Sequence, residues 1–163
     1  SERTITIGGW SKGWAMTGWR LGWITGPTKV MDGVKTINVS SATHVPTFLM
    51  SAAAKALSLD EEVQVMKNAF AERRLLMHQG LSSLPGFVVP EPEGAFYILA
   101  DITGTGLTDI EFAHQALEHA QVQVIPGSLM KGGDGLIRIS YATSIANIHE
   151  GVRRLREWLE SRQ

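Results

Sequence analysis

The sequence predicts an α/β fold, in which short strands alternate with longer helices. Runs rich in β-branched residues recur along the chain, and segments with apolar residues at helical spacing lie between them. Pro and Gly residues separate the two kinds of segment. With 163 residues, of which 44% are hydrophobic and 19% are charged, the chain can bury a core of ordinary size.

The first third of the chain contains two predicted strands and two predicted helices. The strands are β-branched, the helices have a periodic apolar face, and Pro46 suits the first turn of the second helix. A polar stretch over 38–45 predicts a break between the helices. In chain order these elements are the strands 4–7 and 21–25 and the helices 30–37 and 46–57.

The middle of the chain predicts one long helix over 60–85. Asp60 is a suitable N-cap, and apolar residues follow at intervals of three and four. Pro85 and Gly86 end the helix. We interpret the apolar face of this helix as core packing.

The last part of the chain returns to short strands and two helices. Thr108 and Glu111 have the spacing of a capping box, which predicts a helix to about His119. Ser144 is a suitable cap for the last helix. The predicted strands are 87–89, 95–99, 122–125 and 136–140.

The composition excludes several classes of function. The net charge is −1, from 15 Lys and Arg against 16 Asp and Glu, so neither nucleic acid nor an anionic membrane is an expected partner. The chain has no cysteine, which excludes a disulfide framework and a thiolate metal site and fits a reducing compartment. The five histidines show no metal-ligand spacing, so no metal is predicted. No apolar run reaches the roughly 20 residues that span a bilayer, and we predict a cytoplasmic protein.

The strongest chemical signal is one lysine in a loop of small and aromatic residues. Glycines and tryptophans surround Lys12, and Arg20 follows in the same loop. A lysine in apolar surroundings near another cation loses its proton more readily, and the free amine forms Schiff bases with carbonyl compounds. Arginine binds phosphate through its planar fork. Together these residues indicate a pyridoxal 5'-phosphate (PLP) site.

The same loop resembles a known family motif. Ser11 and Lys12, followed by Met16-Thr17-Gly18-Trp19-Arg20-Leu21-Gly22, resemble the lysine motif of the class I and II aminotransferases, which are PLP enzymes of fold type I in the aspartate aminotransferase superfamily. The match has no gap, so it is more specific than a single lysine. The alternative is a surface lysine and arginine that flank a turn.

The resemblance implies a fold and a division of the chain. It implies the C-terminal part of the PLP-dependent transferase fold, in which 1–59 is a remnant of the large PLP-binding domain, 60–85 is a bridging helix and 86–163 is a small α+β domain. In the family, partner strands precede the strand at 4–7. We therefore expect the chain to be a C-terminal fragment, because a lone strand leaves its backbone groups without partners.

The resemblance also implies roles for individual residues. Lys12 would form the Schiff base with PLP and act as general base and acid, and Arg20 would hold the PLP phosphate. Ser11 could add a hydroxyl hydrogen bond to the phosphate, or it could be a turn residue. Many relatives have a serine three residues before the lysine, where this chain has Gly9, so any contact there can only come from the backbone.

Arg138 is the candidate for substrate binding. It stands in an otherwise apolar predicted strand, 136–140, where a charge is costly to bury without a partner. One interpretation is exposure at a sheet edge, and the other is a bidentate clamp on a carboxylate. The sequence of 136–142 resembles the family's C-terminal strand, whose arginine binds the substrate α-carboxylate.

The predicted function is transfer of an amino group between an amino acid and a 2-oxo acid, with PLP as cofactor. The resemblance implies a homodimer for the full-length enzyme and a role in amino-acid metabolism. One alternative is another PLP enzyme of fold type I, such as a C–S lyase. The other alternative is a folded fragment without activity, because the acid that pairs with the PLP ring nitrogen and the ring-stacking residue cannot be assigned in this chain.

Overall fold

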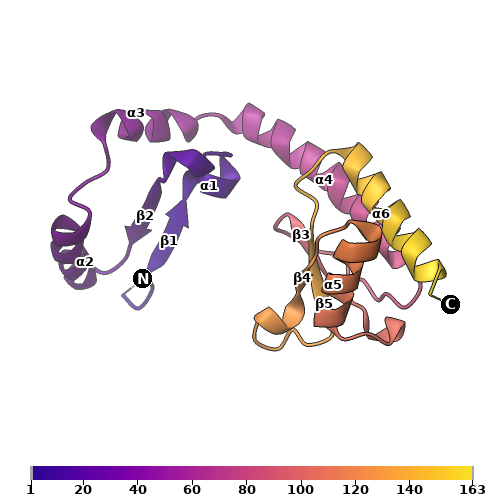
Figure 1. Ribbon diagram of the computed structural model, residues 1–163. Coiled ribbons are helices and arrows are strands. Elements are labelled where there is room, and N and C mark those ends of the chain that lie inside the picture. The colour runs from indigo at the N-terminus through magenta and orange to yellow at the C-terminus, as the bar shows by residue number, and fades with distance from the viewer. Residues whose placement is uncertain (1, 163) are drawn as a thin grey trace. The chain divides into compact units, whose positions relative to one another are not determined.

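The computed structural model describes residues 2–162, and the chain divides into two compact units, Ser1–Met66 and Lys67–Gln163. Figure 1 labels their helices and strands along the chain. Among the described residues, no helix is both long and apolar enough to cross a membrane.

The first unit is built around one antiparallel strand pair. Thr6 pairs with Thr25 and Gly9 pairs with Gly22, so the predicted strands are present, the first of them shifted by two residues. The shift arises because pairing with the partner strand, and not β-branching, decides where a strand ends. The elements of this unit are β1 (Thr6–Gly9), α1 (Trp10–Gly13), η1 (Thr17–Trp19), β2 (Gly22–Thr25), α2 (Thr28–Ser41) and α3 (Thr47–Ala56).

Helix α2 extends into the segment that the sequence predicts as a break. The prediction was wrong over residues 38–41, which are helical. The hydroxyls of Ser40 and Ser41 donate to the carbonyls of Thr36 and Ile37, one turn earlier. Such bonds let serine stay in a helix although it prefers caps and turns.

The long helix α4 (Asp60–Ser82) confirms the prediction of one continuous helix. Three acidic residues, Asp60, Glu61 and Glu62, occupy its first turn, where negative charge is favourable against the helix dipole. The helix crosses the boundary between the two units at Met66. Its C-terminal half contributes Met77 and Leu81 to the core of the second unit.

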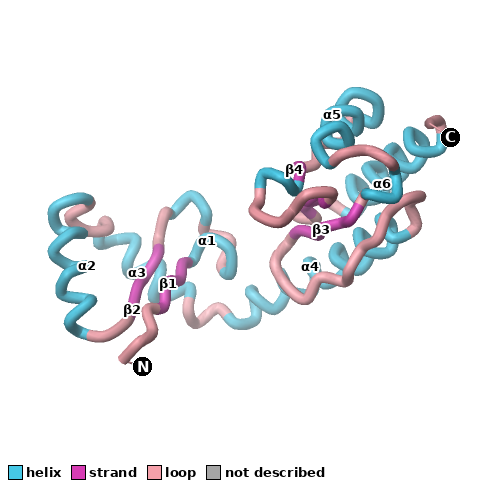
Figure 2. The backbone as a smooth tube through the Cα atoms, turned by 90° about the horizontal axis from the view of Figure 1, so that it is seen from below, coloured by secondary structure: helices cyan, strands magenta, loops and turns pink. Residues whose placement is uncertain are grey.

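The second unit consists of a three-stranded antiparallel sheet packed against helices. The strand order is β3-β5-β4, so β5 is the central strand. Buried side chains of β3 and β5 form one cluster with buried side chains of α4, α5 and α6, and Figure 2 shows the backbone of these elements. The strands are β3 (Tyr97–Asp101), β4 (Ile125–Pro126) and β5 (Leu136–Ser140), and the other elements are η2 (Thr103–Thr105), α5 (Asp109–Ala120), η3 (Gly127–Leu129) and α6 (Ile145–Glu160).

Both predicted helix caps of the second unit are confirmed. Thr108 and Glu111 form a capping box in which each side chain bonds the other residue's backbone N–H. Ser144 accepts a hydrogen bond from the backbone N–H of Asn147 at 3.1 Å. The start of each helix is therefore determined by local spacing, three residues from the cap to its partner.

Two predicted strands are shorter than expected. Residues 87–89 form only an isolated bridge, between Val88 and Asp101. The segment 122–125 contributes only its last residue, Ile125, to β4. Prolines explain the first case, because Pro90 and Pro92 have no N–H to extend the ladder.

Asp109 is a buried acid that ties α5 to η3. Its residue exposure is 5%, and its carboxylate accepts from the Ser128 backbone N–H at 2.7 Å. Hydrogen bonds from Ser128, first from its side chain and then from its backbone, hold the pKa of Asp109 below its ordinary value of 3.8. The charged form of Asp109 therefore stabilises the folded state.

We expect Asp109→Asn to destabilise the chain by about 1.5–3 kcal/mol at pH 7, since a hydrogen bond to a charged group is lost. The folded-state pKa lies below the unfolded one, so this stabilisation is complete above about pH 4 and is lost as the pH falls through the folded-state pKa. Urea denaturation of both proteins at pH 7 and at pH 3 checks this. The difference between the two proteins should shrink at pH 3, and a constant difference would contradict the role of the charge.

Candidate functional site

The three candidate residues of the first unit lie in one loop between β1 and β2. The loop closes where the Trp10 N–H donates to the Leu21 carbonyl at 3.3 Å, directly after the pair Gly9–Gly22. Ser11 and Lys12 follow this closing bond, and Arg20 precedes it. The hairpin therefore brings the predicted lysine and arginine to the same end of the strand pair.

The short helix α1 defines the backbone around Lys12. The Trp14 N–H donates to the Trp10 carbonyl at 3.3 Å, and the Ala15 N–H donates to the Lys12 carbonyl at 3.4 Å. Ser11 is half-buried and Lys12 is exposed. The apolar enclosure that the sequence suggests for Lys12 is therefore not formed by the residues of the first unit, in which Trp19 is exposed as well.

Trp10 fixes the loop to α3. Its indole N–H donates to the Ala53 carbonyl at 3.1 Å, and its ring lies 6.3 Å from the Trp14 ring, centroid to centroid. Leu21, at the other end of the loop, is only 6% exposed, as is Ala53. These contacts anchor both ends of the loop, so that Lys12 projects from a supported backbone.

Arg20 occupies a special backbone position at the end of the loop. Its φ is 53°, in the left-handed region, and it follows η1 directly. Its guanidinium donates from Nη1 to the Thr17 carbonyl at 3.0 Å. Among residues 2–162 no carboxylate forms an ion pair with Arg20, which leaves the charge of this exposed side chain available to an anion.

Two glycines of β1, Gly8 and Gly9, allow β2 to approach closely next to the loop. A Cβ at Gly8 would overlap the Trp23 ring, and a Cβ at Gly9 would lie 3.1 Å from the Leu21 carbonyl oxygen. A side chain at position 9 would crowd the carbonyl that accepts the closing bond, and a side chain at position 8 would have to displace the Trp23 ring. Gly9 can therefore offer only its backbone to a ligand.

Arg138 lies on the central strand of the second unit, so the alternative of a sheet-edge position is wrong. Its Cα pairs with Leu99 of β3 and with Ile125 of β4. The neighbours Ile137 and Ile139 are buried in the core, so Arg138 points to the opposite face of the sheet. The side chain is half-buried on that face.

Arg138 contacts an aromatic ring, and its charge is not neutralised by the chain. Its guanidinium carbon lies 5.2 Å from the centroid of the Tyr97 ring. In the described part of the chain, no carboxylate forms an ion pair with it. The surrounding hollow, of about 400 Å³, is lined by Phe96, Tyr97, Gln123, Ile125, Arg138 and Ser140. A half-buried arginine without a carboxylate partner, facing a hollow, is suited to bind an anionic ligand.

Tyr97 is the residue that sequence reasoning missed. The sequence predicts 95–99 as a strand and 92–97 as scaffold near the edge of the site, with no binding role for Tyr97. Strand alternation could have indicated its position, because Tyr97 and Leu99 lie on the same face of β3. Leu99 pairs with Arg138 across the antiparallel ladder, so Tyr97 and Arg138 share that face.

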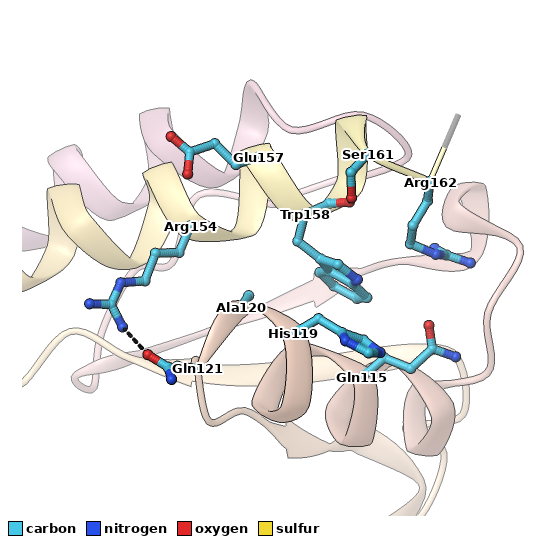
Figure 3. A pocket seen from close by; sticks show the side chains of 9 residues that line it. All are labelled: Gln115, His119, Ala120, Gln121, Arg154, Glu157, Trp158, Ser161 and Arg162. Carbon is cyan, nitrogen blue, oxygen red and sulfur yellow. Dashed lines mark hydrogen bonds between the residues drawn. The ribbon is translucent and has the colours of Figure 1, made fainter.

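Another hollow of the second unit lies between α5 and α6 and contains none of the predicted site residues. Figure 3 shows Arg154, Trp158 and Arg162 of the C-terminal region facing Gln115, His119 and Gln121. Arg154 is already bonded to Glu150 at 2.7 Å and to Gln121 at 3.3 Å. No group of His, Cys, Asp and Glu within residues 2–162 could hold a metal ion.

Comparisons with known proteins agree over almost the whole chain. Residues 1–155 match the sequence family described as "Aminotransferase class I and II". An aspartate aminotransferase of Pyrococcus horikoshii is 39% identical over 163 residues, which cover 98% of this chain and 42% of that protein.

Solved structures show the same similarity. The crystal structure of an aromatic aminotransferase from Pyrococcus horikoshii OT3 matches with a TM-score of 0.94 and 40% identity, over 99% of this chain and 44% of that one. The aspartate aminotransferase of Thermus thermophilus with maleate matches with a TM-score of 0.89 and 34% identity, over 96% of this chain and 41% of that one. The chain therefore has the fold of the matched part of these enzymes, and it spans 42% of the length of the relative from Pyrococcus horikoshii.

Proposed function

Because this chain belongs to the class I and II aminotransferases, we propose that it is part of an enzyme that moves an amino group between an amino acid and a 2-oxo acid. The observation that carries the proposal is the closed loop that brings Lys12 and Arg20 to one end of the hairpin. The match covers 42% of the relative from Pyrococcus horikoshii, which is therefore more than twice as long as this chain. We therefore assign the activity to a polypeptide of that length, with the chain as its C-terminal part.

The loop residues fit PLP as a cofactor. Arg20 has no carboxylate partner in the described chain and offers a bidentate fork to a phosphate. Ser11, next to Lys12, supplies a hydroxyl. PLP, when bound, supplies an aldehyde for amines and an electron sink.

In this proposal Lys12 has the chemical role and Arg138 binds the substrate. The Nζ amine of Lys12 would hold the cofactor and then move a proton at the α-carbon of the amino acid, since an amine can serve as both anchor and proton carrier. Arg138 would hold the α-carboxylate with its fork, as its half-buried and uncompensated charge supports. Aspartate is the first amino donor to test, because it stands in the name of the relative from Pyrococcus horikoshii.

The predicted domain division and assembly belong to the same proposal. We propose 1–59 as part of the PLP-binding domain, 60–85 as the bridging helix and 86–163 as the small domain. A homodimer and a cytoplasmic location are further parts of this proposal, with family membership as support for the first and the absence of cysteine for the second.

Borohydride trapping tests the assignment of Lys12. A polypeptide of the relatives' length that includes this chain is incubated with one equivalent of PLP, reduced with borohydride, digested and mapped by mass spectrometry. We expect the label on the peptide that contains Lys12, because reduction fixes PLP on the amine that holds it.

Two variants make the trapping experiment specific. Lys12→Ala should lose the label, whereas Lys35→Ala, which removes an exposed lysine of α2, should keep it. A label of equal yield on several lysines, or one that survives in Lys12→Ala, would refute the assignment. A C–S lyase would give the same label, so detection of the 2-oxo acid product from aspartate separates the two activities.

A further inference from the structure

We propose that Tyr97 is a positioning residue for Arg138, whose guanidinium it holds edge-on toward the substrate carboxylate. This inference rests on the proposed function, since it assigns Tyr97 a part in carboxylate binding by Arg138. Tyr97 would touch neither substrate nor cofactor in this role. It would act through the orientation of the arginine.

The register of the sheet places Tyr97 within reach of Arg138. On β3, Leu99 lies directly opposite Arg138, and Tyr97 lies opposite Ser140. Tyr97 and Arg138 are thus diagonal neighbours on one face of the sheet, a separation that an aromatic ring and a long side chain can bridge. The 5.2 Å from the guanidinium carbon to the ring centroid is within the range of cation–π attraction.

The Tyr97 ring is itself held in place. It makes an edge contact with the Phe96 ring, with centroids 5.3 Å apart and ring planes at 78°. Phe96 packs against the core cluster of the second unit. The ring that contacts Arg138 is therefore supported by the core, although Tyr97 is 37% exposed.

A ring suits this task better than a carboxylate. The ring attracts the flat face of the guanidinium, whereas a ligand carboxylate uses the N–H groups at its edge. Both contacts can therefore exist together. A protein carboxylate beside Arg138 would compete for those edge groups and cancel the charge, and within residues 2–162 no such ion pair is present.

Maleate provides a test that does not depend on turnover. Maleate is a dicarboxylate and is bound in the related structure from Thermus thermophilus. The polypeptide of full relative length is titrated with maleate by calorimetry, and the KM for aspartate is measured in parallel. We expect Tyr97→Leu, which keeps an apolar side chain but removes the ring, to weaken maleate binding and raise the KM by about two- to fivefold.

Tyr97→Phe is the matched variant, because it keeps the ring and removes only the hydroxyl. It should bind maleate like the unchanged protein, and kcat should be unchanged in both Tyr97 variants. If Tyr97→Phe is as weak as Tyr97→Leu, or if neither differs from the unchanged protein, the positioning role is refuted.

Arg138→Leu separates the failure of this inference from that of the proposed function. If Arg138→Leu loses maleate binding while Tyr97→Leu does not, Arg138 keeps its assigned role and only the role of Tyr97 falls. If Arg138→Leu binds maleate normally, the carboxylate role of Arg138 falls and the inference falls with it.

Discussion

Replacement of Lys12 by alanine should lower the transamination rate of the full-length polypeptide by about 10⁴-fold or more, since the proposed function assigns both the attachment of the cofactor and the proton transfer to this one amine. The fold should be unaffected, because Lys12 is exposed and lies in the short helix α1. The measurement is the initial rate of 2-oxo acid formation from aspartate at saturating PLP, with a second 2-oxo acid present to accept the amino group and far-UV circular dichroism as a check on folding.

Lys12→Arg distinguishes an amine nucleophile from a mere positive charge. Arginine keeps the charge but does not lose its proton at neutral pH, so its rate should be as low as that of Lys12→Ala. Lys35→Ala is the control and should retain the full rate. If Lys12→Arg keeps an appreciable rate, Lys12 acts only through its charge, and another residue must carry the chemistry.

The second large effect is expected from Gly127→Ala, which should destabilise the chain by about 3 kcal/mol. Gly127 is buried at the start of η3. A Cβ there would collide with the Gly133 carbonyl oxygen and would lie 2.6 Å from the Leu136 carbonyl oxygen. These are backbone atoms, so they cannot rotate away as a flexible side chain would.

The surroundings of Gly127 leave little room for relaxation. The Met130 N–H donates to the Gly127 carbonyl at 2.7 Å, and the Gly133 N–H donates to the Met130 carbonyl at 3.0 Å. The next residue, Ser128, is tied to the buried Asp109. The loss should therefore appear as a lower urea midpoint, because the network resists a shift that would admit a methyl group.

Gly151→Ala is the matched control for that substitution. Gly151 lies inside α6, and a Cβ there would meet no atom within 4 Å. Alanine should stabilise this helix position by about 0.5–1 kcal/mol. Opposite shifts of the urea midpoint are thus expected for the two Gly→Ala changes, and equal shifts would contradict the packing argument at Gly127.

Local signals were enough for most elements of the fold. The capping box at Thr108 and the cap at Ser144 depend on spacings of three residues, and the structure has both. The continuity of α4 followed from an apolar periodicity that resumes in phase after Arg73 and Arg74, and from the absence of Pro and of a second cap inside it. The strand expected at 87–89 is reduced to one bridge, because Pro90 and Pro92 have no N–H to extend the ladder. Residues 38–41 are helical, and the hydroxyls of Ser40 and Ser41 bond to carbonyls of the previous turn.

The family resemblance could be recognised from residue identities alone, through Ser11 and Lys12 followed without a gap by the motif 16–22, and the same identities indicated Arg20 and Arg138 as site residues. A motif of this kind depends on residue identity and spacing, both of which the sequence contains. The position of Arg138 on the central strand, on the face opposite the core and next to the Tyr97 ring, could be learned only from the folded chain. The physical reason is that strand order and register are set by hydrogen bonds between segments far apart in the sequence. The residues of one strand do not indicate which strand it pairs with.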